Sequence, residues 1–141
     1  MLSKKTKYAL HALTYLAQKG NENPTLIVEV SEKARIPRKF LESILLDLKK
    51  QGILASKMGK GGGYFLRQEP KDISLATIIR LFNGPIALLP CVSLNYYQPC
   101  DECSNETHCG LNKVMVDVRN ETLRILENKS IQDIIDQEVA I

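Results

Sequence analysis

A proline between two helical patterns constrains the fold of this chain more than any other residue. Before it, Leu26, Val30 and Ala34 recur at intervals of four, the spacing of one face of a short helix. Pro37 has no backbone N–H and is tolerated in the first turn of a helix, so we expect a second helix to start there. The second pattern ends before Gly52, a glycine expected just past a helix terminus. Its core face consists of Leu41, Ile44, Leu45 and Leu48.

A glycine-rich stretch separates two short extended runs directly after the second helix. The runs cover residues 53–57 and 63–67, and the sequence between them is Met-Gly-Lys-Gly-Gly. This arrangement is typical of a β-hairpin, and no Gly-Lys-Ser/Thr sequence opens a helix as in a P-loop. Two helices and a hairpin also occur in α+β domains that bind no nucleic acid. Helix-turn-helix spacing with lysines on the hairpin nevertheless favours a winged helix-turn-helix.

The basic residues gather in the half of the chain that contains this motif. Residues 1–70 hold 13 Lys and Arg against 6 Asp and Glu, whereas residues 71–141 hold 6 against 10. Such asymmetry is expected of a basic head that binds double-stranded DNA and a separate acidic body. The expected DNA contacts are Arg38, Lys39, Glu42 and Ser43 on the second helix, Lys57, Lys60, Gly61 and Tyr64 on the wing, and Lys4 and Lys5 at the N-terminus.

Further amphipathic patterns predict the remaining helices. Residues 3–19 form the first, with Ser3 as its cap, and a short one follows Ser74 and ends at Gly84. A long pattern over 111–128 runs through Leu111, Val114, Met115, Val118, Thr122, Ile125 and Leu126. The expected fold class is mainly α with a small β-hairpin wing.

Three regions follow from these patterns. We expect a winged helix-turn-helix DNA-binding domain over 1–84, a cysteine-rich sensor loop over 85–110, and a long dimerisation helix with a final short helix over 111–141. The long helix either packs on its own domain or pairs with a second copy. We expect the homodimer, because two recognition helices can then occupy half-sites about 34 Å apart.

All four cysteines lie in the central loop, at Cys91, Cys100, Cys103 and Cys109. No apolar run reaches the roughly 18 residues of a membrane span, and no signal peptide is visible, so we expect a cytoplasmic protein with reduced thiols. Clustered cysteines there indicate metal ligands or redox thiols rather than structural disulfides. The spacing suits zinc or an iron–sulfur cluster without choosing between them, and the neighbouring Asp101 and His108 are further ligand candidates.

Two other classes of protein fit parts of the pattern. An enzyme with a cysteine nucleophile would need a base, and neither His11 nor His108, the only histidines, has a recognisable catalytic setting. We therefore expect no enzyme. A zinc-stabilised adaptor that binds protein through its long helix, without DNA binding, is the alternative.

Several of these segments together resemble a known family. They are KKTKYALHALTYLA at the start, IPRKFLESIL in the second helix of the motif, KGGGYFL on the wing, and the cysteine loop ahead of a long helix. The chain resembles, over nearly its whole length, the BadM/Rrf-type family of bacterial winged-helix transcriptional regulators, the family of the iron–sulfur proteins IscR and NsrR. This resemblance implies a homodimeric, redox-sensing regulator in which a cluster loop and crossed long helices connect two DNA-binding heads.

The resemblance also implies which residues hold the cluster. The ligand cysteines of the family correspond to Cys91, to one of Cys100 or Cys103, and to Cys109. Members with a histidine ligand place it three residues after the last cysteine, where this chain has Asn112. Others take an aspartate from the first helix of the partner, where the nearest match is Lys7. The fourth cysteine allows an all-cysteine site, and 2Fe-2S, 4Fe-4S, zinc and no metal all remain open.

Overall fold

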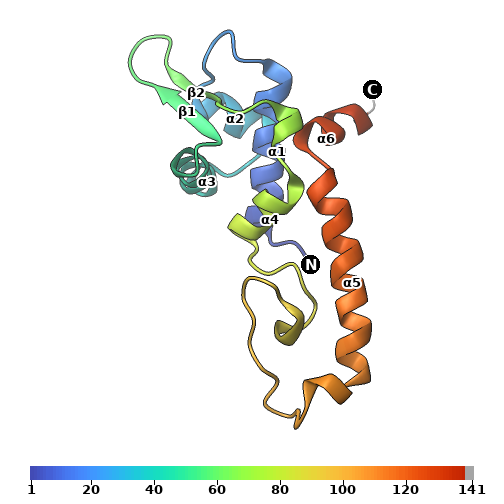
Figure 1. The fold of residues 1–141 in the computed structure, drawn as a ribbon. Coiled ribbons are helices and arrows are strands. Elements are labelled where there is room, and N and C mark those ends of the chain that lie inside the picture. The colour runs from blue at the N-terminus through green and yellow to red at the C-terminus, as the bar shows by residue number, and fades with distance from the viewer. Residues whose placement is uncertain (139–141) are drawn as a thin grey trace.

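Helices and a single hairpin make up the part of the chain that the computed structural model describes, residues 1–138 (Figure 1). The expected fold class, mainly α with a small hairpin wing, is confirmed. None of the described helices is both long and apolar enough to cross a membrane. The elements in chain order are α1 (Lys4–Lys19), α2 (Ile27–Ala34), α3 (Arg38–Lys50), β1 (Leu54–Lys57), β2 (Gly63–Leu66), α4 (Leu75–Phe82), α5 (Gly110–Asn128) and α6 (Ile131–Gln137), with short 3-10 turns at Pro70–Asp72 (η1), Pro90–Val92 (η2) and Glu106–His108 (η3).

The break between α2 and α3 is built on three consecutive residues. Arg35 caps α2 in the left-handed region with φ 54°, the buried Ile36 turns into the core, and Pro37 precedes α3. Pro37 is the N-cap residue of α3 and not part of its first turn, so the expected helix start was one residue early. The expected place of Leu26 on the buried face of α2 was also wrong. Leu26 is the N-cap residue of α2 and 57% exposed, and Val30 is the residue that α2 buries.

The end of α3 leads directly into the wing. Gly52, with φ 73°, follows the C-cap residue. Its N–H donates to the carbonyl of Lys49, and the N–H of Ile53 donates to that of Leu48, which is a Schellman ending. Strands β1 and β2 then pair antiparallel, from Leu54 opposite Leu66 to Lys57 opposite Gly63. The helix-turn-helix therefore connects to the hairpin without a flexible linker.

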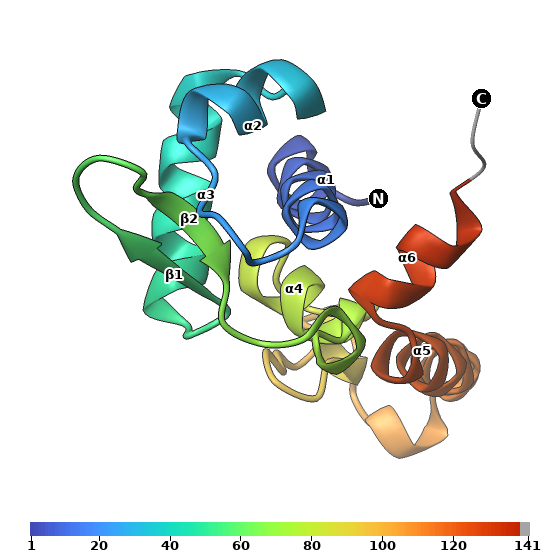
Figure 2. The ribbon, with the colours of Figure 1, turned by 90° about the horizontal axis from the view of Figure 1, so that it is seen from above.

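Helix α1 lies at the centre of the body. Figure 2 shows α2 and α3 on one side of it and α6 on the other, and all three helices contact it, as do α4 and β2. Ala9, Ala12 and Leu13 on α1 are fully buried. The C-terminal α6 adds the fully buried Ile131 to this same core, although it follows α5 in the chain.

Helix α5 extends from the body and carries the cysteine loop near its far end (Figure 1). It packs on α4, and Leu123, which was not in the expected stripe, is the residue that it buries. Most of the expected stripe does not face the body of its own chain. Four of its members are between 38% and 57% exposed, namely Leu111, Val114, Val118 and Ile125.

Candidate DNA-binding surface and cysteine cavity

The exposed face of α3 carries the residues expected to read DNA. Arg38, Lys39, Glu42 and Ser43 are all exposed. Arg38 Nε lies 3.4 Å from Glu42 Oε1, one helical turn on, and both side chains are 61% exposed. An exposed pair of this kind is weak, so both side chains are free to exchange their partner for a base edge or a phosphate.

The N-terminus of α1 lies beside this face. Lys5 Nζ donates a hydrogen bond to Ser43 Oγ at 3.1 Å and lies 3.6 Å from Asp47 Oδ2. Two residues expected to contact DNA from distant parts of the sequence are therefore in contact with each other. Lys4 is exposed one position earlier.

The wing presents lysines on a hairpin with a rigid base. Lys57, Lys60 and Gly61 are exposed, and the sequence did not point to Met58, which is 92% exposed at the tip. Tyr64 is half-buried against the core, while its backbone exchanges two hydrogen bonds of 2.8 Å with Thr25. This contact adds a third extended segment beside β2 and holds the wing against the start of α2.

A charged cluster joins α2 to α1 behind this surface. Glu29 on α2 accepts hydrogen bonds from Lys19 and from Tyr15, both on α1, the latter at 2.5 Å. The bond from Lys19, then that from Tyr15, lowers the pKa of Glu29. The carboxylate in turn raises the pKa of Tyr15 to about 12. These bonds to Glu29 fix α2, the first helix of the helix-turn-helix, on α1.

The four cysteines line one cavity of about 410 Å³ at the far end of α5. All are free thiols, Cys100 exposed and the other three partly buried. Within residues 1–138, no group of three or more Cys, His, Asp or Glu side chains is already arranged to bind one metal ion. The chemistry of the donor set, four soft sulfur atoms around one cavity, nevertheless fits an iron–sulfur cluster or zinc.

The two other ligand candidates differ in position. Asp101 lines the same cavity, whereas His108 is not among its lining residues and has its ring Nδ1 3.1 Å from Asn105 Nδ2. Tyr97 donates a hydrogen bond to Glu106 at 2.5 Å, and this carboxylate is the main reason why the pKa of Tyr97 is raised. The hydrogen bond between Tyr97 and Glu106 fastens the outer part of the loop.

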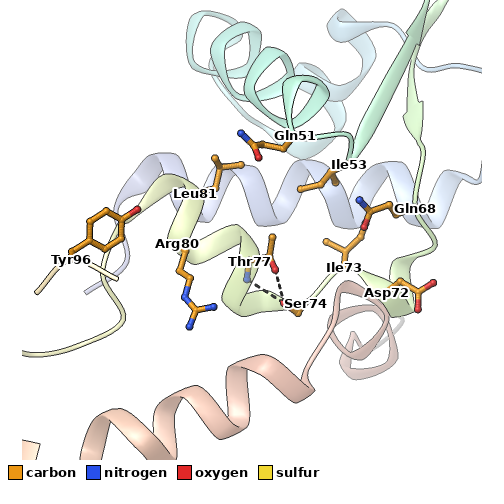
Figure 3. Close-up of a pocket in the computed structure, with 10 residues that line it drawn as sticks. All are labelled: Gln51, Ile53, Gln68, Asp72, Ile73, Ser74, Thr77, Arg80, Leu81 and Tyr96. Atoms are coloured by element: carbon orange, nitrogen blue, oxygen red, sulfur yellow. Dashed lines mark hydrogen bonds between the residues drawn. The ribbon is translucent and has the colours of Figure 1, made fainter. Parts of the chain in front are cut away.

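The cysteine loop is attached to the rest of the molecule at two places. Arg119 on α5 donates to the carbonyl of Val92 at 2.9 Å, and Val92 and Ser93 are buried. Further along the loop, Tyr96 forms one wall of a second cavity of about 340 Å³ (Figure 3). Gln51, the C-cap residue of α3, also lines this cavity, so the loop and the end of the expected recognition helix border the same space.

The helix-turn-helix, the hairpin with its exposed lysines and the neighbouring basic N-terminus define a winged-helix DNA-binding protein. A family model described as "Rrf2: Iron-dependent Transcriptional regulator" matches residues 2–137. The chain belongs to the Rrf2 family, which confirms the resemblance seen in the sequence.

Individual relatives agree with this assignment. The chain is 40% identical over 138 residues to an rrf2-like HTH-type transcriptional regulator of Rhodobacter capsulatus, covering 96% of this chain and 92% of that protein. It is 29% identical over 142 residues to the HTH-type transcriptional regulator IscR of Pectobacterium carotovorum, covering 99% and 87%. The structure of CymR, the global cysteine regulator of B. subtilis, has the same fold, with a TM-score of 0.79, 23% identity and coverage of 99% and 98%. The family and both sequence relatives are described as transcriptional regulators, so the chain is a DNA-binding transcriptional regulator.

Proposed function

We propose that this regulator acts as a homodimer whose DNA affinity depends on an iron–sulfur cluster, or on the redox state of the thiols, at the cysteine loop. The observation that carries the proposal is that one helix, α5, connects the two functional parts. Its far end contributes Cys109 to the four-cysteine cavity, and its other end packs on α4 of the DNA-binding body. The description of the family as iron-dependent supports iron as the metal.

The exposed stripe on α5 supports the homodimer. Leu111, Val114, Val118 and Ile125 lie three, four and seven residues apart, spacings that place side chains on the seam between paired helices of a coiled coil. Apolar residues gathered on an exposed face of a helix are costly in water and indicate a contact surface. A second copy of α5 fits this stripe, because the same residues then face each other across a two-fold axis.

The chain's own residues supply the proposed route between the loop and DNA. Cys91, Cys100, Cys103 and Cys109 would hold the cluster, which when bound supplies iron and sulfide that react with oxidants. Arg119 and Val92 fasten the loop to α5, while Tyr96 reaches the cavity next to the end of α3. Ordering of the loop would thereby change the spacing of the two recognition helices in the dimer.

The first experiment combines metal analysis with DNA binding. Protein purified without oxygen is expected to show visible absorption bands, with iron and sulfide in parallel amounts, and a DNA affinity that changes when the cluster is removed. Replacing Cys91 or Cys109 by Ala should abolish iron retention and leave the helical content unchanged. A colourless protein with zinc and no salt-dependent affinity for DNA would instead support the zinc-stabilised adaptor. A colourless metal-free protein that still binds DNA would reduce the proposal to thiol sensing.

A further inference from the structure

Asn112 contacts two of the four cysteine sulfurs. Its backbone N–H donates to Cys109 Sγ at 3.4 Å, and its side-chain Nδ2 donates to Cys91 Sγ at 3.5 Å. The two cysteines come from opposite ends of the loop, one on η2 and the other at the N-cap of α5. One residue in the first turn of the long helix therefore spans both ends of the cysteine segment.

The segment around Cys91 is held to α5 at two levels. Asn112 bonds the sulfur of Cys91, and Arg119 bonds the carbonyl of the next residue, Val92, at 2.9 Å. Positions 112 and 119 are seven residues apart and lie on the same face of a helix. Cys91 is consequently placed by α5 itself. No hydrogen bond in the described part of the chain reaches the sulfurs of Cys100 and Cys103, which belong to the outer part of the loop.

The chemistry of the Asn112 side chain suits holding sulfur without binding metal. A carboxamide nitrogen is a neutral donor whose lone pair is delocalised, so it donates to a sulfur and is a poor metal ligand. Its hydrogen bond strengthens when the acceptor becomes a thiolate, because the bond is then charge-assisted. Such bonds orient ligands and tune the potential of clusters that the sulfurs hold.

We propose that Asn112 is a positioning residue that holds Cys91 and Cys109 as a preformed pair of sulfur donors facing the 410 Å³ cavity. The pair forms the inner side of the site, on α5, and Cys100 and Cys103 close it from the loop. Metal binding then needs only the outer two cysteines to be ordered. The proposal rests on the proposed sensor role of the loop.

The variant Asn112→Leu tests this role. The leucine side chain has nearly the shape of asparagine, donates no hydrogen bond, cannot bind metal and favours helix more than asparagine does. The variant therefore removes the bond to Cys91 and keeps the backbone N–H that bonds Cys109. A weaker site in this variant therefore cannot arise from a destabilised α5 or from lost volume. Asn128→Leu is the matched control, since Asn128 is the same residue type, is exposed at the end of the same helix away from the cysteine loop, and its side chain bonds only the carbonyl of Arg124 among the described residues.

Cobalt titration of reduced, metal-free protein gives the first measurement. Co²⁺ bound to thiolates shows charge-transfer absorption, which reports both affinity and the number of sulfur ligands. We expect Asn112→Leu to weaken Co²⁺ binding roughly tenfold or more and to reduce this absorption, while Asn128→Leu leaves both unchanged. Equal affinity and equal absorption in Asn112→Leu and the unaltered protein would overturn the positioning role while leaving the metal site in place.

A second measurement needs no metal and separates the two proposals. If no form of the protein shows sulfur-to-cobalt absorption, the metal-binding function fails, and thermal unfolding of the metal-free protein decides on Asn112. We expect the effects of Asn112→Leu and Cys91→Ala on Tm to be non-additive, and those of Asn128→Leu and Cys91→Ala to be additive. Additive effects for Asn112 and Cys91 would overturn the pairing.

Discussion

Lys5 at the start of α1 donates a hydrogen bond to Ser43 on α3, with Nζ and Oγ 3.1 Å apart. Both residues were expected to contact DNA, and the bond makes them a single unit on the DNA-binding surface. We expect Lys5→Ala and Ser43→Ala to be non-additive in DNA affinity, with a coupling free energy on the order of 1 kcal/mol. Fluorescence anisotropy titrations of the four proteins at one salt concentration measure this. Lys4→Ala combined with Ser43→Ala should be additive, because no hydrogen bond between these residues occurs in the described chain.

Lys60 at the wing should contribute through charge alone. It is exposed, and within residues 1–138 it has no ion-pair partner. We expect Lys60→Ala to weaken binding to all DNA sequences alike and to flatten the plot of log affinity against log salt by about one unit. Lys113→Ala, at the start of α5 beside the cysteine loop, should leave the slope unchanged. A loss confined to one operator sequence would contradict a phosphate contact for Lys60.

Gly63 should tolerate no side chain, because β2 lies against the chain before α2. A Cβ at Gly63 would lie 2.4 Å from the carbonyl oxygen of Thr25, and its φ of 141° is unfavourable for other residues. We expect Gly63→Ala to lower the free energy of unfolding by on the order of 2 kcal/mol or more, measured by urea unfolding. Gly59→Ala is the control: φ is 87° there but the space is open, so only the backbone strain of about 1 kcal/mol should appear. Equal losses would contradict the close approach.

Val114 should be needed for dimerisation and not for folding. It is 55% exposed on α5, so a glutamate there costs the monomer little. If two α5 helices pair, Val114→Glu places a charge in the interface from each chain, and we expect a monomer in sedimentation velocity with unchanged circular dichroism. Asn120→Glu, on the other side of α5, should remain dimeric. A dimer that persists in Val114→Glu would mean that this stripe is not the interface.

Glu29 should make the stability of the protein depend on pH at both extremes. Its pKa is lowered from 4.5 by bonds from Lys19 and Tyr15, so its contribution to stability is present above pH 4.5 and is lost as the pH falls through the folded-state pKa. The pKa of Tyr15 is raised from 10.0 to about 12, so that contribution is present below pH 10 and is lost as the pH rises towards 12.

Comparison with Glu29→Gln measures both effects. The difference in free energy of unfolding between the two proteins should be largest at intermediate pH and shrink on either side. Glu32→Gln is the matched control, because it removes an exposed carboxylate from the same helix without touching Tyr15 or Lys19. A difference in the free energy of unfolding that stays constant from about pH 3 to about pH 11 would contradict the role of the bonds from Lys19 and Tyr15 to Glu29.

Local patterns in the sequence were sufficient for most helices and for the wing. Ser3 and Ser74 cap α1 and α4 as expected, and Gly52 ends α3 in the left-handed conformation. Caps, proline and glycine act within a few residues of themselves, so their effect can be read without knowing the fold. The expected core face of α3 is also confirmed, since a regular helical period marks one face without knowledge of the fold. Its four residues are fully buried: Leu41, Ile44, Leu45 and Leu48.

Periodicity could not decide which surface an apolar face meets. The expected stripe of α5 included exposed residues, such as Val114 and Ile125, together with the partly buried Leu126. It left out Leu123, which is buried. A helix facing its own core and a helix facing a second copy have the same spacing of apolar residues. The prediction for Leu26 was wrong for a related reason. An N-cap residue can continue the apolar spacing in the sequence although it lies outside the helix.

The sequence by itself determined the class of this protein: a helix-turn-helix with a basic hairpin, four cysteines in one segment, and membership of a family of regulators. Only the tertiary structure brought Lys5 to Ser43, α6 to α1, and Asn112 to Cys91. These contacts join residues between 21 and 120 positions apart, as with Asn112 to Cys91 and Gln18 to Glu138. Packing of whole helices decides such pairs, and no local preference of the residues themselves encodes them.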